Sequence, residues 1–294
     1  MTGERPRRIG LFWALGAAAG SAFMAIPWKL ANGAGSAEHA VFVLLFTAAV
    51  GNTGLLAWQQ RGARRALSRI DIGVAAGLAG FTLLGNHLSA LAVQDMSPAI
   101  FNLILRSELP LTALAAWALL RERVGMRFWL GTAIAITGIF LLQAHPRGAL
   151  SGTTPWTTLI AITSAGCFAA LAVTTRAFVH RIDLIGVNAI RLWFAVGLWF
   201  LFNEPASVTT IPAAQWAYAT VAAVGGPFLG RLMLMQSART IEAGLSTLVM
   251  LLAPVLTLLP AFVFLDEWPA PHELFGGAVV LVGIAFPLWE PRTR

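Results

Sequence analysis

Long apolar runs separated by short polar loops dominate the chain. Ten such runs can be drawn, each close to the roughly 20 residues that a helix needs to cross the hydrocarbon core of a bilayer. Their predicted bounds are 9–28, 39–58, 71–93, 98–120, 127–143, 155–175, 185–203, 213–236, 243–264 and 273–289. The runs are too long and continuous for barrel strands, and they lack alternation with a period of two. The pattern therefore predicts an all-α integral membrane protein with ten transmembrane helices.

The second half of the chain repeats landmarks of the first half at an offset of 145 positions. Three glycines and a glutamate recur at this offset: Gly85, Glu122, Gly131 and Gly138 correspond to Gly230, Glu267, Gly276 and Gly283. The loop around the first glutamate, 121–127, is net positive, whereas the loop around the second, 266–273, is net negative. Five helices in each half force the second half to insert upside down. We therefore expect two inverted five-helix repeats, at 1–147 and 148–294.

The distribution of Lys and Arg predicts the orientation, because cytoplasmic loops carry the excess of these residues. With the N-terminus inside, 15 of the 20 Lys and Arg residues fall in cytoplasmic segments. Only Lys29 and Arg147 fall in segments on the outer side of the membrane, and the other three lie within the spans. The N-terminal run resembles a signal peptide, but it continues to Trp28 without a small-x-small cleavage site, so we interpret it as a retained first helix. Both termini are expected in the cytoplasm of a multi-pass protein of a bacterial-type inner (cytoplasmic) membrane.

Composition agrees with a lipid-solvated chain. The sequence is 57% hydrophobic and 11% charged, which cannot cover a soluble surface that needs about a quarter charged residues. The net charge of +7 does not indicate nucleic acid as a partner, because the arginines lie in short loops between apolar runs and form no basic domain.

Motifs for enzymes, metals and cofactors are absent from the sequence. The single lysine, Lys29, follows no glycine-rich loop, so no Walker motif can form. The five histidines are dispersed, with none paired at i, i+4, and no GxSxG elbow occurs. Cys167 is the one cysteine, which excludes an intramolecular disulfide. We expect no catalytic residues, no metal and no cofactor.

A family resemblance rests on the repeated landmarks. The spacing of Pro254, Glu267, Gly276 and Gly283 resembles the EamA repeat of the drug/metabolite transporter superfamily, and the first half repeats it with Pro110 one place out of register. Arg191 resembles the arginine that opens the second helix of each repeat, although its counterpart in the first half is Phe46. The resemblance covers almost the whole chain and is greatest to the YddG-type aromatic amino acid exporters. It implies ten helices, internal termini, a central cavity and the export of amino acids.

Polar residues inside spans are the candidates for the substrate site, because transporters of this architecture bind substrate near the midplane and such residues are costly there. An outer vestibule is predicted around helices three and four, and an inner one around helices eight and nine. The predicted cavity comprises Phe23, Asn86, His87, Phe101, Asn102, Arg106, Glu108, Arg231, Ser246 and Thr247. Predicted hinges are Pro27, Gly226 and Pro227, since proline and glycine kink helices.

Several of these residues have two interpretations. Glu108 is the only carboxylate near a helix midpoint; it can face a substrate ammonium, couple protons, or form a structural ion pair with a membrane arginine. Arg106 can bind a carboxylate through its guanidinium fork, or pair elsewhere. Arg191 and Arg231 can bind substrate or extend to the cytoplasmic face. His87 can shuttle protons, or be a hydrogen-bonded core residue.

The sequence thus predicts a monomeric secondary carrier that exports amino acids, large apolar or aromatic ones, by alternating access between two vestibules. Its partners are a small-molecule substrate and membrane lipid. The first alternative is a carrier for another metabolite or drug, such as a purine or a cation. The remote alternative is an integral-membrane lipid-modifying enzyme, for which the loops lack clustered acidic or histidine residues.

Overall fold

The computed structural model describes residues 4–59, 67–95, 104–122, 125–142, 154–265 and 270–288. Throughout these ranges the regular structure is helical, with no strand. The first half contains α1 (Glu4–Gly33), α2 (Ala37–Gln59), α3 (Arg69–Asp95), α5 (Glu108–Leu120) and α6 (Met126–Leu142). The second half contains α7 (Pro155–Phe178), α8 (Leu184–Trp199), η1 (Pro205–Thr210), α9 (Ala213–Ala223), η2 (Val224–Phe228), α10 (Leu229–Ser237), α11 (Ala243–Met250), α12 (Ala253–Leu265) and α13 (Pro271–Leu288). Each predicted span coincides with a helix or with consecutive helices, and the span 98–120, described from residue 104 on, contains α5.

The surface of the helices is suited to lipid. Five helical segments of the described chain are long and apolar enough to cross a membrane, and further apolar helices are shorter. Large apolar side chains point outward along them, including Phe12, Trp117 and Val263, which are 68%, 61% and 61% exposed. Helices satisfy their backbone hydrogen bonds internally, which the hydrocarbon region requires. An apolar exterior on an all-helical chain is the arrangement that a bilayer stabilises.

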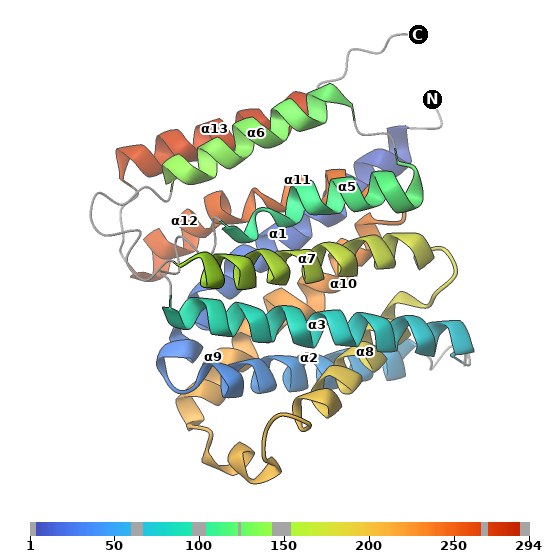
Figure 1. Ribbon diagram of the computed structural model, residues 1–294, viewed down its shortest axis with the longest axis vertical. Helices are drawn as coiled ribbons and strands as arrows, with labels where there is room; N and C mark the ends of the chain where they lie inside the picture. Colours follow the sequence, from blue (N-terminus) through green and yellow to red (C-terminus); the bar gives the residue numbers. More distant parts are fainter. Residues whose placement is uncertain are drawn as a thin grey trace.

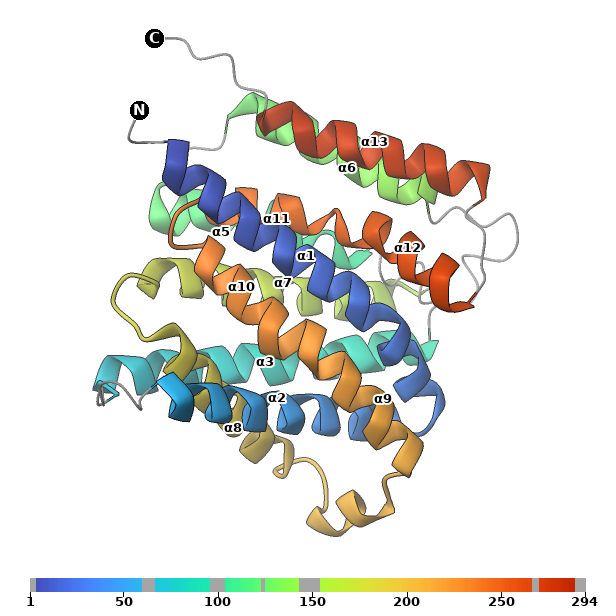
Figure 2. The same ribbon diagram turned by 180° about the vertical axis from the view of Figure 1, so that it is seen from behind.

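The helices of the two halves pack in matched pairs (Figures 1 and 2). α3 packs against α7 as its counterpart α10 packs against α1, and α5 packs against α7 as α12 packs against α1. Two further contacts join counterparts directly, namely α2 with α8 and α6 with α13. Exchanging these helices for their counterparts therefore reproduces the contacts just named, which indicates a pseudo-two-fold relation between the halves.

The repeated glycines lie where counterpart helices cross. In Figure 1, α6 and α13 run side by side along one edge of the molecule. A Cβ added to Gly131 would lie 2.6 Å from the carbonyl oxygen of Gly283, and one added to Gly138 would lie 2.8 Å from that of Gly276. Gly131 thus meets the counterpart of Gly138, and Gly138 meets the counterpart of Gly131, so α6 and α13 are antiparallel. Close approach of backbones is what small residues permit in lipid.

A break in helical geometry interrupts the segment from α9 to α10. Gly226, within the π-helical turn η2, has φ −89° and ψ −106°, which is not helical. The broken turn lies against α1, because a Cβ added to Gly20 would be only 2.6 Å from the carbonyl oxygen of Gly225. Of the predicted hinge residues, Gly226 and Pro227 lie in this break, whereas Pro27 lies within α1.

Candidate functional site

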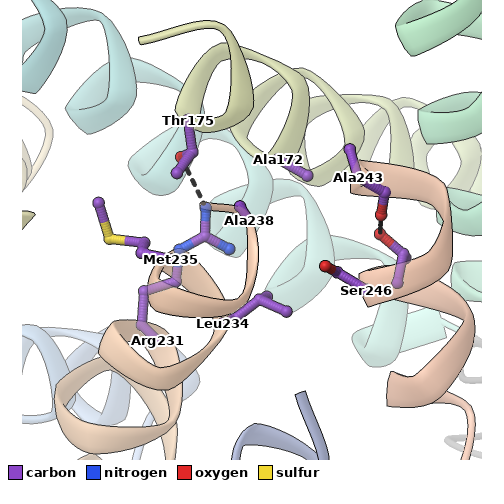
Figure 3. Close-up of a pocket in the computed structure, with 9 residues that line it drawn as sticks. Ala172, Thr175, Arg231, Leu234, Met235, Ala238, Ala243 and Ser246 are labelled. Carbon is purple, nitrogen blue, oxygen red and sulfur yellow. Dashed lines mark hydrogen bonds between the residues drawn. The ribbon is translucent and has the colours of Figure 1, made fainter. Parts of the chain in front are cut away.

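The predicted inner vestibule is assembled around a small cavity between α7, α10 and α11 (Figure 3). Its volume is about 20 Å³, which is room for about one water molecule. The lining combines apolar side chains with a guanidinium and hydroxyl groups, and consists of Ala172, Thr175, Arg231, Leu234, Met235, Ala238, Ala243, Ser246 and Thr247. All three inner-vestibule residues predicted from the sequence therefore line one cavity.

Arg231 is the cationic group of this cavity. Its Nη2 donates to the Oγ1 of Thr175 at 3.4 Å, a long hydrogen bond, whereas its buried Nε has no hydrogen-bond partner. The hydroxyls of the opposite wall are engaged: Ser246 shares a hydrogen bond of 2.6 Å with Ser237, and Thr247 donates to the carbonyl of Ala243. A buried N–H without an acceptor is costly, so Arg231 retains capacity to bind an anionic or carbonyl oxygen.

Glu108 lies within electrostatic range of two arginines. It begins α5, and its carboxylate interacts with the charges of Arg106 and Arg231. No direct ion pair joins the described side chains of Glu108 and Arg231, so the two opposite charges attract each other across a gap. Glu108 is therefore positioned to balance positive charge at the cavity, or to receive a positive group between itself and the arginines.

A buried polar network, which the sequence did not predict, connects α2, α3, α8 and η2. Arg191 is only 2% exposed, and its Nε and Nη2 donate to the Oδ1 of Asn188 at 3.1 and 2.7 Å. Its Nη1 donates to the Oγ1 of Thr82 at 2.6 Å. The Nδ2 of Asn188 donates to the Oδ1 of Asn52 at 2.9 Å and reaches the carbonyl of Pro227 at 3.4 Å. Arg191 is thus held inside the protein, which corrects the interpretation that it extends to the cytoplasmic face.

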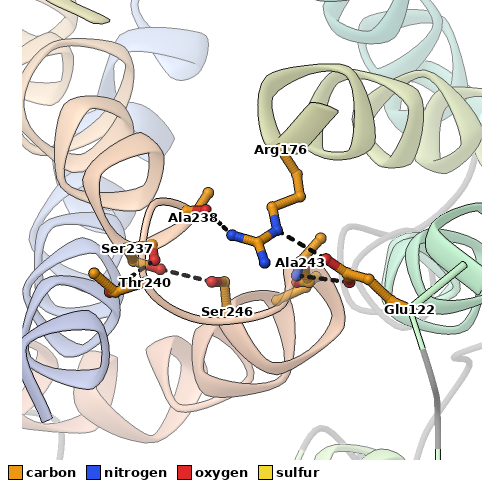
Figure 4. A network of polar contacts seen from close by, with 8 residues as sticks. Glu122, Arg176, Ser237, Ala238, Thr240, Ala243 and Ser246 are labelled. Carbon is orange, nitrogen blue, oxygen red and sulfur yellow. Dashed lines mark hydrogen bonds and ion pairs between the residues drawn. The ribbon is translucent and has the colours of Figure 1, made fainter. Parts of the chain in front are cut away.

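A polar clamp formed by Glu122 and Arg176 lies beside the cavity (Figure 4). Glu122, beyond the end of α5, accepts a hydrogen bond from the Nε of Arg176 at 2.8 Å and one from the backbone N–H of Ala243 at 3.2 Å. Arg176 also donates to the carbonyl of Ala238. Ala238 and Ala243 both line the cavity and flank the loop between α10 and α11. Glu122 therefore links the end of α5 to the loop between α10 and α11, which belong to the other half.

Of the residues predicted to line the outer vestibule, the structure describes contacts of Asn86 and His87. Asn86 donates to the carbonyl of Thr82 in its own helix at 2.7 Å, and His87 stacks against Phe202 with ring centroids 6.4 Å apart. Phe23 is 47% exposed on α1, near Gly225. Phe101 and Asn102 lie outside the described residues.

Other hydrogen bonds also join helices of the two halves. The Ser164 hydroxyl of α7 donates to the carbonyl of Gly85 at 2.9 Å and hydrogen-bonds Ser89 at 2.8 Å. Asp71 accepts from the backbone N–H of Asp183 at 3.0 Å, joining the start of α3 to the loop before α8. These contacts fix the framework around the cavity.

Comparison with known proteins places both halves in one family. Residues 8–143 and 155–289 each match the sequence profile of the EamA-like transporter family. A solved structure titled "Crystal structure of protein" is similar to this chain, with a TM-score of 0.72, 20% sequence identity, and coverage of 95% of this chain and 96% of that chain. At this identity the likeness is one of fold alone. No curated protein matches this chain.

Proposed function

Because the chain belongs to the EamA-like transporter family, we propose that it is a secondary carrier that exports amino acids from the cytoplasm. Membership makes it a multi-pass membrane protein, surrounded by lipid, that transports small molecules. Both repeats of the family occur in one chain. The finer assignment, to large apolar or aromatic amino acids, is our proposal, because the match is to the family as a whole.

The observation that carries the proposal is the cavity between α7, α10 and α11 with Arg231 in its wall. A guanidinium with a free N–H can hold a carboxylate through charge-assisted hydrogen bonds. The alanine, leucine and methionine side chains around it offer an apolar surface to the rest of the ligand. A few polar groups in an otherwise apolar site are typical of small-molecule binding sites.

Alternating access is proposed as the mechanism. The cavity of about 20 Å³ is far too small for an amino acid, because ligand sites occupy roughly 300–1,000 Å³. The described conformation is therefore closed at this point, and the clamp made by Glu122 and Arg176 keeps the loop between α10 and α11 in place. Opening requires this loop to separate from α5 and α7.

Inverted repeats with boundaries at 1–147 and 148–294, and both termini in the cytoplasm, complete the proposal. The antiparallel crossing of the counterparts α6 and α13 supports inversion of the halves. The excess of Lys and Arg in loops on one side supports the orientation and an inner-membrane location. In this orientation the cavity lies toward the cytoplasmic side.

Counterflow in liposomes tests the function. Purified protein reconstituted with unlabelled amino acid inside should accumulate labelled phenylalanine, with saturation. Saturable exchange of a labelled purine or drug cation, with no exchange of phenylalanine, would reassign the substrate. Absence of exchange for all twenty amino acids, in protein shown to be folded, would contradict amino-acid export.

Energy coupling is tested at Glu108. If its carboxylate carries the coupled proton, Glu108→Gln should remove the dependence of export on a pH gradient and leave counterflow intact. If transport is facilitated diffusion, the same substitution should alter affinity at most. Flux measured with and without an imposed pH gradient separates the two mechanisms.

A further inference from the structure

The charges around the cavity do not balance for a zwitterionic ligand. Three arginines lie within the predicted spans, at positions 106, 191 and 231, against the single mid-span carboxylate of Glu108. Arg191 and Arg231 interact electrostatically with each other, and Arg231 and Arg106 both interact with Glu108. The Glu122–Arg176 pair beside the cavity is neutral as a pair, and Glu242, next to Ala243, adds one negative charge, so these groups together leave an excess of one positive charge. In a low-dielectric interior, excess charge is costly unless an opposite charge neutralises it.

We propose that the cavity recognises a carboxylate without requiring an ammonium, so that the carrier also transports apolar organic anions such as aryl-substituted 2-oxo acids. This inference rests on the proposed function and names the ligand class of the same site. A monoanion reduces the positive excess by one charge, whereas a zwitterion leaves it unchanged.

The group that binds the anion is Arg231. Its Nε is buried without an acceptor, and its one side-chain hydrogen bond, to Thr175, is 3.4 Å long. A carboxylate can accept from both Nε and Nη2 along one edge of the guanidinium, which gives Nε an acceptor and replaces a long hydrogen bond at Nη2. The other buried arginine, Arg191, is already bonded to Asn188 and Thr82 and contributes positive potential rather than a free donor.

Glu108 is a poor partner for a ligand ammonium. Its negative charge is already balanced by two arginines, Arg106 and Arg231. An ammonium placed beside Glu108 would gain one attraction and would also meet repulsion from these guanidiniums. Glu108 therefore acts as the counter-charge that keeps the arginines from repelling one another, and the ammonium of an amino acid contributes little to its affinity.

The remaining lining favours an apolar body on the anion. Ala172, Leu234 and Met235 form much of the wall, and the hydroxyl groups of Ser246 and Thr247 are bonded to protein partners. A ligand with many hydroxyls or a second charge would leave polar groups unpaired against this wall, which is costly. The site therefore fits a single carboxylate attached to a hydrocarbon or aromatic group.

Three ligands of one skeleton test the inference on the full chain. Phenylalanine carries both charges, phenylpyruvate carries only the carboxylate, and phenethylamine carries only the ammonium. Each is assayed for a thermal shift of the detergent-purified protein and for inhibition of labelled phenylalanine counterflow. We expect phenylpyruvate to stabilise and compete at least as well as phenylalanine, and phenethylamine to do neither.

Variants test whether these ligands bind at Arg231 in the cavity. Arg231→Gln should weaken phenylpyruvate and phenylalanine about 10- to 100-fold, the range for one charged hydrogen bond. Arg231→Lys keeps the charge and should weaken both less. Arg239→Gln, at an exposed arginine just beyond α10, is the matched control and should change neither. Glu108→Gln should not weaken phenylalanine relative to phenylpyruvate.

The outcomes separate the two proposals. Binding of phenylalanine but not phenylpyruvate, with Glu108→Gln selectively weakening phenylalanine, would overturn the inference and leave amino-acid export standing. Binding of phenethylamine alone would overturn both and indicate a cation carrier. Failure of all three ligands to bind or to exchange, in folded protein, would also overturn both.

Discussion

At the scale of single residues, the main discovery is that Arg191 is a structural cation with neutral partners. Asn188 and Asn52 are both completely buried. Asn188 and Thr82 provide the oxygen acceptors of the guanidinium, and Asn52 accepts a hydrogen bond from Asn188. Hydrogen bonds to charged groups are the stronger ones, so Asn188 should matter more to stability than Asn52. The network joins helices of both halves at the depth where η2 breaks.

Two alanine variants test this ranking. Asn188→Ala removes the acceptor of two guanidinium N–H groups and should destabilise the fold by about 3 kcal/mol. Asn52→Ala removes a bond between neutral groups and should cost about 1 kcal/mol. Unfolding midpoints in the same detergent give the comparison. Equal losses, or a larger loss for Asn52→Ala, would show that Arg191 does not depend on Asn188.

Sequence reasoning found Arg231, Ser246 and Thr247 and missed this network, for a physical reason. Polar residues inside spans are visible in a sequence, but their partners are distant: Arg191 meets Thr82 across 109 positions, and Asn188 meets Asn52 across 136. A signal was present, because Asn52 and Asn188 are themselves polar residues within predicted spans. Helical periodicity predicts which face a residue occupies, but it does not predict which helix covers that face.

At the scale of helices, glycines separate close crossings from open faces. A Cβ on Gly138 would lie 2.5 Å from the backbone nitrogen of Val280 and 2.8 Å from the oxygen of Gly276, whereas one on Gly77 would meet nothing within 4 Å. Backbone atoms cannot move aside singly, so a methyl group at Gly138 must push α6 and α13 apart.

Alanine substitutions at Gly138 and Gly77 should therefore have different effects on the free energy of unfolding. Gly138→Ala should destabilise the protein by about 1–3 kcal/mol through overpacking. Gly77→Ala should be neutral, or stabilising by up to about 1 kcal/mol, because alanine is the better helix former. Thermal unfolding in detergent gives both values, and a stabilising Gly138→Ala would contradict the crossing of α6 with α13.

The clamp at Glu122 gives a second prediction at this scale. The side chains of Arg176 and Glu122 are 22% and 13% exposed, so the pair is partly buried, and a glutamine would keep an oxygen that can accept one of the same hydrogen bonds. Glu122→Gln should therefore leave the fold intact and loosen the loop between α10 and α11. Hydrogen–deuterium exchange of the amides in 238–243 should accelerate, while Glu38→Gln, at an exposed glutamate on α2, leaves it unchanged. Unaltered exchange in Glu122→Gln would mean that other contacts hold the loop.

At the scale of the whole molecule, the ten apolar runs predicted the helices well because lipid imposes a length and a hydropathy that a sequence displays directly. The repeat at an offset of 145 identifies which helices of the two halves correspond to each other. It does not predict which of these helices are in contact, and that required the three-dimensional structure. The break near Gly226 was predicted as a hinge from glycine and proline, and its position against α1 required the fold.

Opposite insertion of the halves makes a prediction that two positions can test. Gly125, before α6, and Ala270, before α13, are counterparts at the offset of 145. In an inverted pair these loops face opposite sides of the membrane, with Gly125 in the cytoplasm. Single-cysteine variants at each position, made in a Cys167→Ala background because Cys167 is the one native cysteine, can be treated with a membrane-impermeant maleimide in intact cells.

Ala270→Cys should react from outside, and Gly125→Cys should react only after the cells are permeabilised. Positive charge near Gly125, from Arg121 and Arg127, is the physical reason, since such loops stay on the cytoplasmic side. The reverse pattern would keep the inversion and place both termini outside. Labelling of both cysteines from the same side would contradict the inverted repeat itself, because an odd number of crossings must separate counterparts in the two halves.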